Sequence, residues 1–104
     1  MLVTKDNDMS DKEIYLQKMR AQLDEWKADV DKLKAKASKA SADARLEKNK
    51  QIEVLESKIE EGKTKLSELS IAGEDAWESL KEGVESAWDS LKSAVSDAAV
   101  KFKD

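Results

Sequence analysis

The stretch SDKEIYLQKMRAQLDEWKADVDKL, residues 10–33, decides the fold class of this 104-residue chain. It opens with Ser10, a good N-cap residue, and Glu13 completes the S-x-x-E capping box that marks the start of a helix. Apolar residues then recur three or four positions apart, and from Leu23 onward they follow an a/d heptad pattern. The spacing predicts an amphipathic helix that begins near Ser10, with residues 1–9 before it as a disordered N-terminal tail.

The apolar stripe narrows to alanine at residues 37–44, a segment that contains no Gly, Pro or Asn. Because alanine is the best helix former, we interpret residues 10–72 as one long heptad-like helix, with a turn near 37–44 as the alternative. The step from Ala44 to Ile52 is eight residues rather than seven, and this phase shift disturbs a regular heptad supercoil.

A break is expected around Gly73, which could end the first helix as a left-handed C′ residue, although it also fits a stripe that continues without interruption. Residues 73–104 are predicted to form a C-terminal amphipathic helix. Within it, AWESLKEGVES at 76–86 is repeated as AWDSLKSAVSD at 87–97. Eleven residues in three turns keep an apolar stripe almost straight along a helix, which suits a helical bundle or a helix lying on a lipid surface.

The sequence therefore predicts an all-α protein, a long amphipathic helix plus a C-terminal helix with eleven-residue repeats, in a coiled-coil or helical-bundle assembly. A helix over residues 10–72 would be about 90 Å long, and its stripe would stay in water unless another helix covered it. We therefore expect self-association, unless a turn near 37–44 closes a three-helix bundle within one chain. The residues expected to form this oligomer or packing stripe are Leu23, Trp26, Val30, Leu33, Ile52, Leu55, Ile59, Leu66, Leu69, Trp77, Leu80, Val84, Trp88, Leu91, Val95 and Phe102.

Charge is unevenly spread along the chain, which carries a net charge of −4. Residues 32–50 hold seven bases against two acids, whereas residues 74–104 hold eight acids against four lysines. Five carboxylates between Asp75 and Asp89 form an acidic ridge that we interpret as a solvated helix face. Because the chain has no histidine and no cysteine, we predict no catalytic, metal-binding or cofactor-binding residues and no small-molecule substrate.

These features favour a non-enzymatic structural or interaction protein that forms a homo-oligomer and could also bind another protein. A lipid-surface protective protein is the alternative, which the acidic polar face of residues 74–104 argues against. A nucleic-acid-associated protein using residues 32–50 is weaker, because that segment has no aromatic residue to stack on bases. No apolar run approaches the ~18 residues of a membrane span, so we expect a cytoplasmic protein.

The segment Leu23-Asp24-Glu25-Trp26, a Lys/Ala-rich helix after it, and AGEDAWESLK at residues 72–81 together resemble a family of small bacterial coiled-coil proteins. Some members of that family are associated with stress response. The likeness spans roughly residues 12–102. It implies a bacterial, cytosolic helical protein with a stress-related role, and it supplies no catalytic or binding residues.

Overall fold

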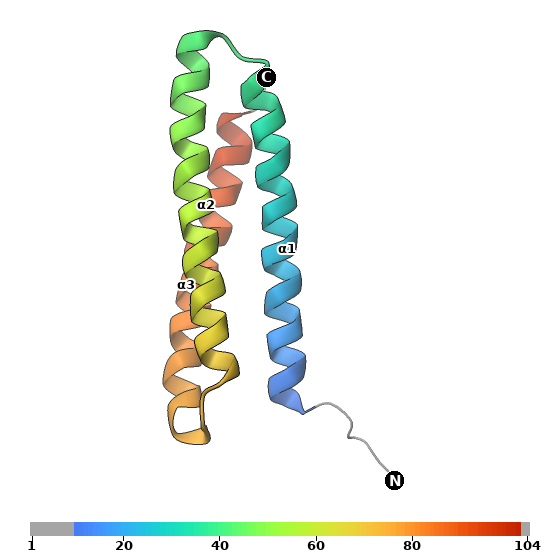
Figure 1. The fold of residues 1–104 in the computed structure, drawn as a ribbon, viewed down its shortest axis with the longest axis vertical. Helices are drawn as coiled ribbons and strands as arrows, with labels where there is room; N and C mark the ends of the chain where they lie inside the picture. Colours follow the sequence, from blue (N-terminus) through green and yellow to red (C-terminus); the bar gives the residue numbers. More distant parts are fainter. Residues whose placement is uncertain (1–9, 103–104) are drawn as a thin grey trace.

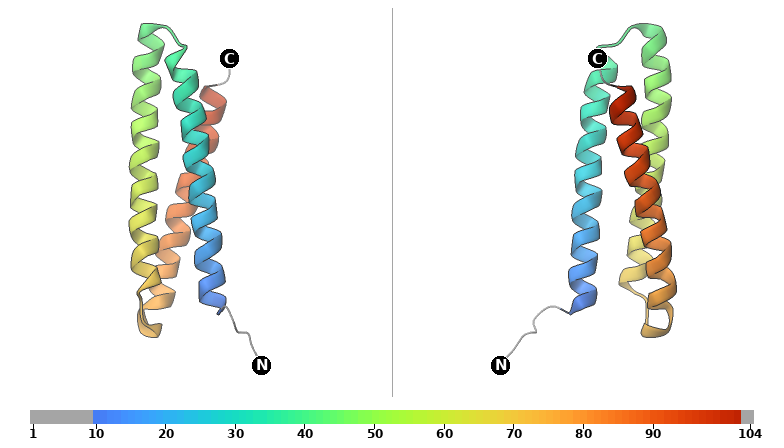
Figure 2. Two further views of the ribbon diagram at one scale, coloured as in Figure 1. Left: turned by 45° about the vertical axis from the view of Figure 1, so that its right-hand side comes forward. Right: turned by 180° about the vertical axis from the view of Figure 1, so that it is seen from behind.

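The computed structural model describes residues 10–102, which form three helices: α1 (Asp11–Ser38), α2 (Ala42–Ser70) and α3 (Glu74–Lys101). Figure 1 shows α1 and α2 side by side and antiparallel, with α3 returning along α2 so that it runs parallel to α1. The two views of Figure 2 show that α3 also crosses the space between the other two helices. The all-α helical bundle predicted from the sequence is confirmed.

The first turn lies between Ser38 and Ala42, so the prediction of one continuous helix over residues 10–72 is wrong and the alternative turn near 37–44 is correct. The chain turns here because the turn allows the apolar stripes of α1 and α2 to be buried against each other. By folding back, α2 covers the stripe of α1 and has its own stripe covered. Each fully buried large apolar side chain contributes about 1.5–3 kcal/mol. The helical hydrogen bonds lost in a short turn are worth roughly 1 kcal/mol each.

The turn needs no glycine or proline because its backbone stays in ordinary regions. Lys39 is nearly helical, with φ −93° and ψ −6°, and Ser41 is extended, with φ −61° and ψ 163°. The Arg45 amide donates to the Ser41 carbonyl at 2.7 Å, and the Arg45 guanidinium donates to the Ala40 carbonyl at 3.4 Å. The absence of Gly, Pro and Asn from residues 37–44 is therefore no obstacle to a turn.

The second turn confirms the break expected around Gly73, but this residue is the N-cap of α3 rather than a left-handed C′ residue. Its φ of −76° and ψ of 173° are extended backbone, and its carbonyl accepts from the amide of Trp77 at 3.0 Å. Glu74 and Asp75 occupy the first turn of α3, where the helix dipole favours negative charge. The helix predicted over residues 73–104 is thus confirmed from Glu74 to Lys101.

Helix α1 begins where the capping signal placed it. The Ser10 hydroxyl accepts a hydrogen bond from the Glu13 amide at 3.2 Å, with Ser10 in the extended conformation typical of an N-cap. The predicted N-terminal tail, residues 1–9, and the last two residues of the predicted C-terminal helix lie outside the described residues. Within residues 10–102, no helix combines the length and the apolar character needed to cross a bilayer.

The three helices turn their apolar stripes toward one core, in which the described residues bury no polar or charged side chain. All sixteen residues predicted for the packing stripe lie there, fourteen of them buried and Trp26 and Leu80 partly buried. They come from all three helices of the same chain. The stripe is therefore covered within one chain, and the long uncovered stripe that led us to expect a second chain is not present.

Two features of the core refine the heptad pattern. Leu16 is buried as well, at 9% exposure, so the pattern that we start at Leu23 extends back toward the beginning of α1. On α2, Gly62 lets a tryptophan approach the helix closely, because a Cβ added there would lie 3.1 Å from Cζ3 of Trp88. Gly62 thus sits on the stripe because the space beside it is filled by an indole ring from α3.

Candidate interaction surface

The fold gathers the charge of the sequence at the two ends of the bundle. Residues 32–50 surround the α1–α2 turn, and their seven bases against two acids make this the basic end, with a net charge of +5. Residues 66–86 surround the α2–α3 turn at the acidic end, and their six acids against Lys81 give this segment a net charge of −5. Figure 1 places the two turns at opposite extremes of the long axis. The 29 residues of α2 separate the ends by about 43 Å.

Aromatic pairs join α1 to α3 along the side where these two helices meet. Near the acidic end, the rings of Tyr15 and Trp77 lie edge to face with centroids 6.0 Å apart. Halfway along, the rings of Trp26 and Trp88 are 6.1 Å apart and tilted by 60°. Such pairs contribute roughly 0.5–1.5 kcal/mol beyond their burial. They hold together two helices whose backbones come close at fewer positions than either does with α2.

Lysines cover the aromatic rings near the bundle ends. Lys12 lies 5.0 Å from the centroid of Trp77 and Lys81 lies 5.2 Å from that of Tyr15, both near the acidic end. Near the basic end, Lys48 of α2 lies 4.6 Å from the ring of Phe102. These cation–π contacts pack lysine stems over the core and leave the ammonium groups in water.

The Tyr15 hydroxyl is in an unusual environment for a residue this close to the surface. Burial, and then the charge of the neighbouring Glu85 carboxylate, raise the pKa of Tyr15 from 10.0 to about 12. The Tyr15 hydroxyl has no hydrogen-bond partner in the structure, so burial and the nearby charge are the causes of the raised pKa. Ionisation of Tyr15 would place a second negative charge beside Glu85, so the neutral phenol is the form that the fold stabilises.

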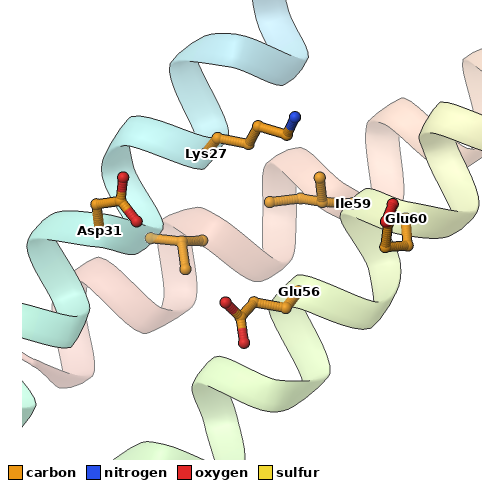
Figure 3. A pocket seen from close by; sticks show the side chains of 6 residues that line it. Lys27, Asp31, Glu56, Ile59 and Glu60 are labelled. Atoms are coloured by element: carbon orange, nitrogen blue, oxygen red, sulfur yellow. The ribbon is translucent and has the colours of Figure 1, made fainter.

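A groove between α1 and α2 carries acidic side chains above an apolar floor. Figure 3 shows Glu56 of α2 pointing toward α1 and Lys27 of α1 extending into the space between the helices, with Asp31 close to α1 and Glu60 on α2. Val30 and Ile59 form the floor. The Glu56 carboxylate lies 2.6 Å from the Lys34 ammonium, and the hydrogen bond and charge of Glu56 raise the pKa of Lys34.

The side chains of this groove are those of an ordinary contact between two helices, with charged residues at its edge and apolar residues beneath them. Within residues 10–102, no three His, Cys, Asp or Glu side chains converge as a metal site would need. The five carboxylates of the predicted acidic ridge on α3 are all exposed. They lie along an open helix face, which is a poor cage for a divalent cation.

The side between α1 and α3 offers the more distinctive surface, which we call the α1–α3 seam. It consists of two adjoining open grooves of about 400 Å³ and 330 Å³, which share Trp26 and Lys92. Both buried side-chain polar atoms that lack a hydrogen-bond partner in the described part of the chain, the Tyr15 hydroxyl and the Trp88 Nε1, belong to residues on this side. The buried polar atoms that the fold leaves without a hydrogen bond are therefore concentrated on this side.

Sequence reasoning predicted which residues are apolar and packed but missed that α1 and α3 would form this seam. The sixteen predicted residues are spread through the core, and only some reach the seam: Trp26, Leu33, Trp88 and Val95. The polar residues of the seam could not be predicted from the sequence, because α2 and two turns separate α1 from α3 along the chain. Equal spacing offered one clue, since Tyr15 and Trp77 are 62 positions apart, as are Trp26 and Trp88.

Comparison with known proteins found no matching family model, no matching curated protein and no matching solved structure. The resemblance to small bacterial coiled-coil proteins accordingly rests on the sequence motifs alone.

Proposed function

We propose that this protein is a non-enzymatic interaction protein that associates with copies of itself. The observation that carries the proposal is the separation of charge, with +5 over residues 32–50 at the basic end and −5 over residues 66–86 at the acidic end of a bundle whose apolar stripe is covered. Opposite ends of neighbouring copies attract one another, whereas like ends repel. Each exposed pair contributes at most ~1 kcal/mol, so association is expected to be reversible and weakened by salt.

Absolute mass in solution tests this proposal. Light scattering after size-exclusion chromatography, on a dilution series at low and at high salt, should give a mass above 11.6 kDa that falls on dilution and on adding salt. A mass of one chain at every concentration in low salt would overturn it. The sequence resemblance extends the proposal to a stress-related role in a bacterial cytoplasm.

Binding to a lipid surface is a second candidate, favoured by one property of the core. Trp77 and Trp88 of the eleven-residue repeat are buried, at 8% and 4% exposure. No buried polar side chain within residues 10–102 ties the helices together. Opening at the two turns would therefore transfer an apolar face from the core to lipid without breaking a buried polar pair.

Vesicles of zwitterionic phosphatidylcholine test this candidate, because the acidic α3 would be repelled by anionic lipid. If the bundle opens on lipid, quenchers placed in the acyl chains should reduce the fluorescence of Trp77 and Trp88. Fluorescence that stays unquenched at saturating vesicle concentration would exclude lipid binding by this route.

A further inference from the structure

We infer that the α1–α3 seam is the surface on which a second copy of this chain docks, in antiparallel orientation. The inference rests on the proposed self-association and deepens it by naming the surface and the direction. It follows from where the seam places its charges and its one incompletely buried tryptophan.

The two grooves of the seam carry opposite charge. The groove nearer the acidic end is lined by Glu85 and Asp89. The groove nearer the basic end is lined by Lys32 and Lys36 together with Asp29. Apart from the shared Lys92, the first groove therefore has a charge of −2 and the second a charge of +1.

This arrangement is self-complementary about a two-fold axis through the middle of the seam. In an antiparallel pair, the acidic groove of each copy faces the basic groove of the other, so both contacts are attractive. In a parallel pair, each groove faces its own equivalent and both contacts are repulsive. A two-fold interface uses one patch on both copies, as this requires.

Trp26 lies at the centre of the surface. It is the only one of the three tryptophans that the bundle leaves partly exposed, and both grooves include it. Large aromatic residues near the centre of an interface commonly dominate its binding energy. A two-fold axis near Trp26 would bring the two copies of this residue close together and remove their exposed edges from water.

The size of the seam fits a weak, reversible contact. On α1 the two grooves run from Met19 to Lys36, 18 residues or about 27 Å. With a width of two helices, or about 20 Å, the face covers roughly 540 Å², which is below the ~800 Å² that each partner buries in an interface of standard size and is typical of a transient contact. The exposed apolar residues elsewhere, such as Leu46 and Val54 on α2, do not adjoin a groove of this extent.

Reversing the charge of one groove at a time tests the inference. The double variant Lys32→Glu/Lys36→Glu makes both grooves negative, and Glu85→Lys/Asp89→Lys makes both positive. All four side chains are exposed, so both variants should keep the helical circular dichroism of the wild type. Each alone is expected to sediment as a single chain at concentrations where the wild type associates. Their equimolar mixture should recover the wild-type mass, because each mismatched groove then meets its opposite.

A control separates the seam from the general charge of the ends. Lys39→Glu/Lys50→Glu removes the same charge from the basic end at exposed positions outside the two grooves. Because it also lowers the charge of the basic end, it should weaken association, but by clearly less than Lys32→Glu/Lys36→Glu does. If the control dissociates as fully as the seam variants, or if the mixture stays monomeric, the docking surface is wrong while self-association stands. A wild-type protein that is monomeric throughout would overturn both.

Discussion

At the scale of single residues, two serines at helix N-caps differ in how much they stabilise the helix that follows them. Ser10 and Ser41 are both N-caps in extended conformation. Only Ser10 accepts a hydrogen bond from the helix, whereas Ser41 makes no side-chain capping bond. The contribution of each cap to stability therefore depends on this hydrogen bond and not on residue type.

We predict that Ser10→Ala lowers the free energy of unfolding by about 0.5–2 kcal/mol, the usual cost of losing an N-cap hydrogen bond. The matched variant Ser41→Ala should change it by only a few tenths of a kcal/mol, since no capping bond is lost. Urea denaturation followed by circular dichroism measures both. Equal losses in the two variants would contradict this account of the caps.

The two glycines inside helices also differ by their surroundings. A Cβ at Gly62 would press on Trp88 at 3.1 Å and would touch Leu23 at an ordinary contact distance of 3.5 Å, whereas a Cβ at Gly83 would meet nothing within 4 Å. The close contact with Trp88 favours glycine at the first position, and no neighbouring side chain favours it at the second.

Valine at each position should therefore have opposite consequences. Gly62→Val is expected to destabilise the protein by about 1–3 kcal/mol, because the branched side chain overpacks the core. Gly83→Val should be neutral or slightly stabilising, since any ordinary residue favours a helix more than glycine does. Thermal unfolding of the two variants beside the wild type distinguishes them, and a stable Gly62→Val protein would show that Trp88 can move away at little cost.

At the scale of the elements, the two turns differ in how the sequence marks them. Gly73 lies at the second turn, where a break is expected, whereas the first turn, at residues 39–41, contains neither glycine nor proline. The eight-residue step from Ala44 to Ile52 does not mark the first turn either, because both residues belong to α2.

The contact between α1 and α3 gives rise to a prediction about pH. Tyr15 is the only tyrosine, so the ultraviolet absorbance of tyrosinate reports it alone. The native protein should titrate near pH 12 and the urea-unfolded chain near 10.0. Glu85→Gln should lower the native value only part of the way to 10.0, because burial is the larger cause.

The raised pKa also fixes the direction of the stability change. A phenol whose pKa is higher in the folded state contributes stability that is fully present below pH 10, and this is lost as the pH rises through about 12. Between these values the wild type should lose more stability than Tyr15→Phe, which has no group to ionise there. Parallel pH profiles for the two proteins would show that Tyr15 is not held in its neutral form.

At the scale of the whole molecule, one core joins all three helices. The cluster of buried residues draws on α1, α2 and α3 without a polar break within residues 10–102. None of the helices has a separate core of its own, so we expect them to unfold together.

Truncation of a central core residue tests this cooperativity. Leu69→Ala, at a position with 0% exposure, should cost about 2–5 kcal/mol. The loss should appear equally in circular dichroism and in tryptophan fluorescence. The control Leu46→Ala, at 65% exposure on α2, should change stability by less than about 0.5 kcal/mol. Separate transitions for the two probes would indicate that one helix leaves the bundle before the others.

Much of this protein is determined by its sequence alone. Helical periodicity, the Ser10 cap, the break at residues 71–73 and the identity of the core residues all depend on neighbours within a few turns of one helix, and these were predictable. The charge of each segment could also be read directly. Such features are local, because a helix forms from hydrogen bonds and side-chain spacing within its own length.

The tertiary structure decided the rest. The turn after Ser38 exists because burial against distant residues outweighs the high helix propensity of the alanine-rich segment. The same folding back covers the stripe within one chain and brings residues 62 positions apart into the α1–α3 seam. Helix propensity depends only on nearby residues and favours continuing the helix through residues 37–44. The burial that favours a turn there depends on contacts with distant residues, which exist only in the folded bundle.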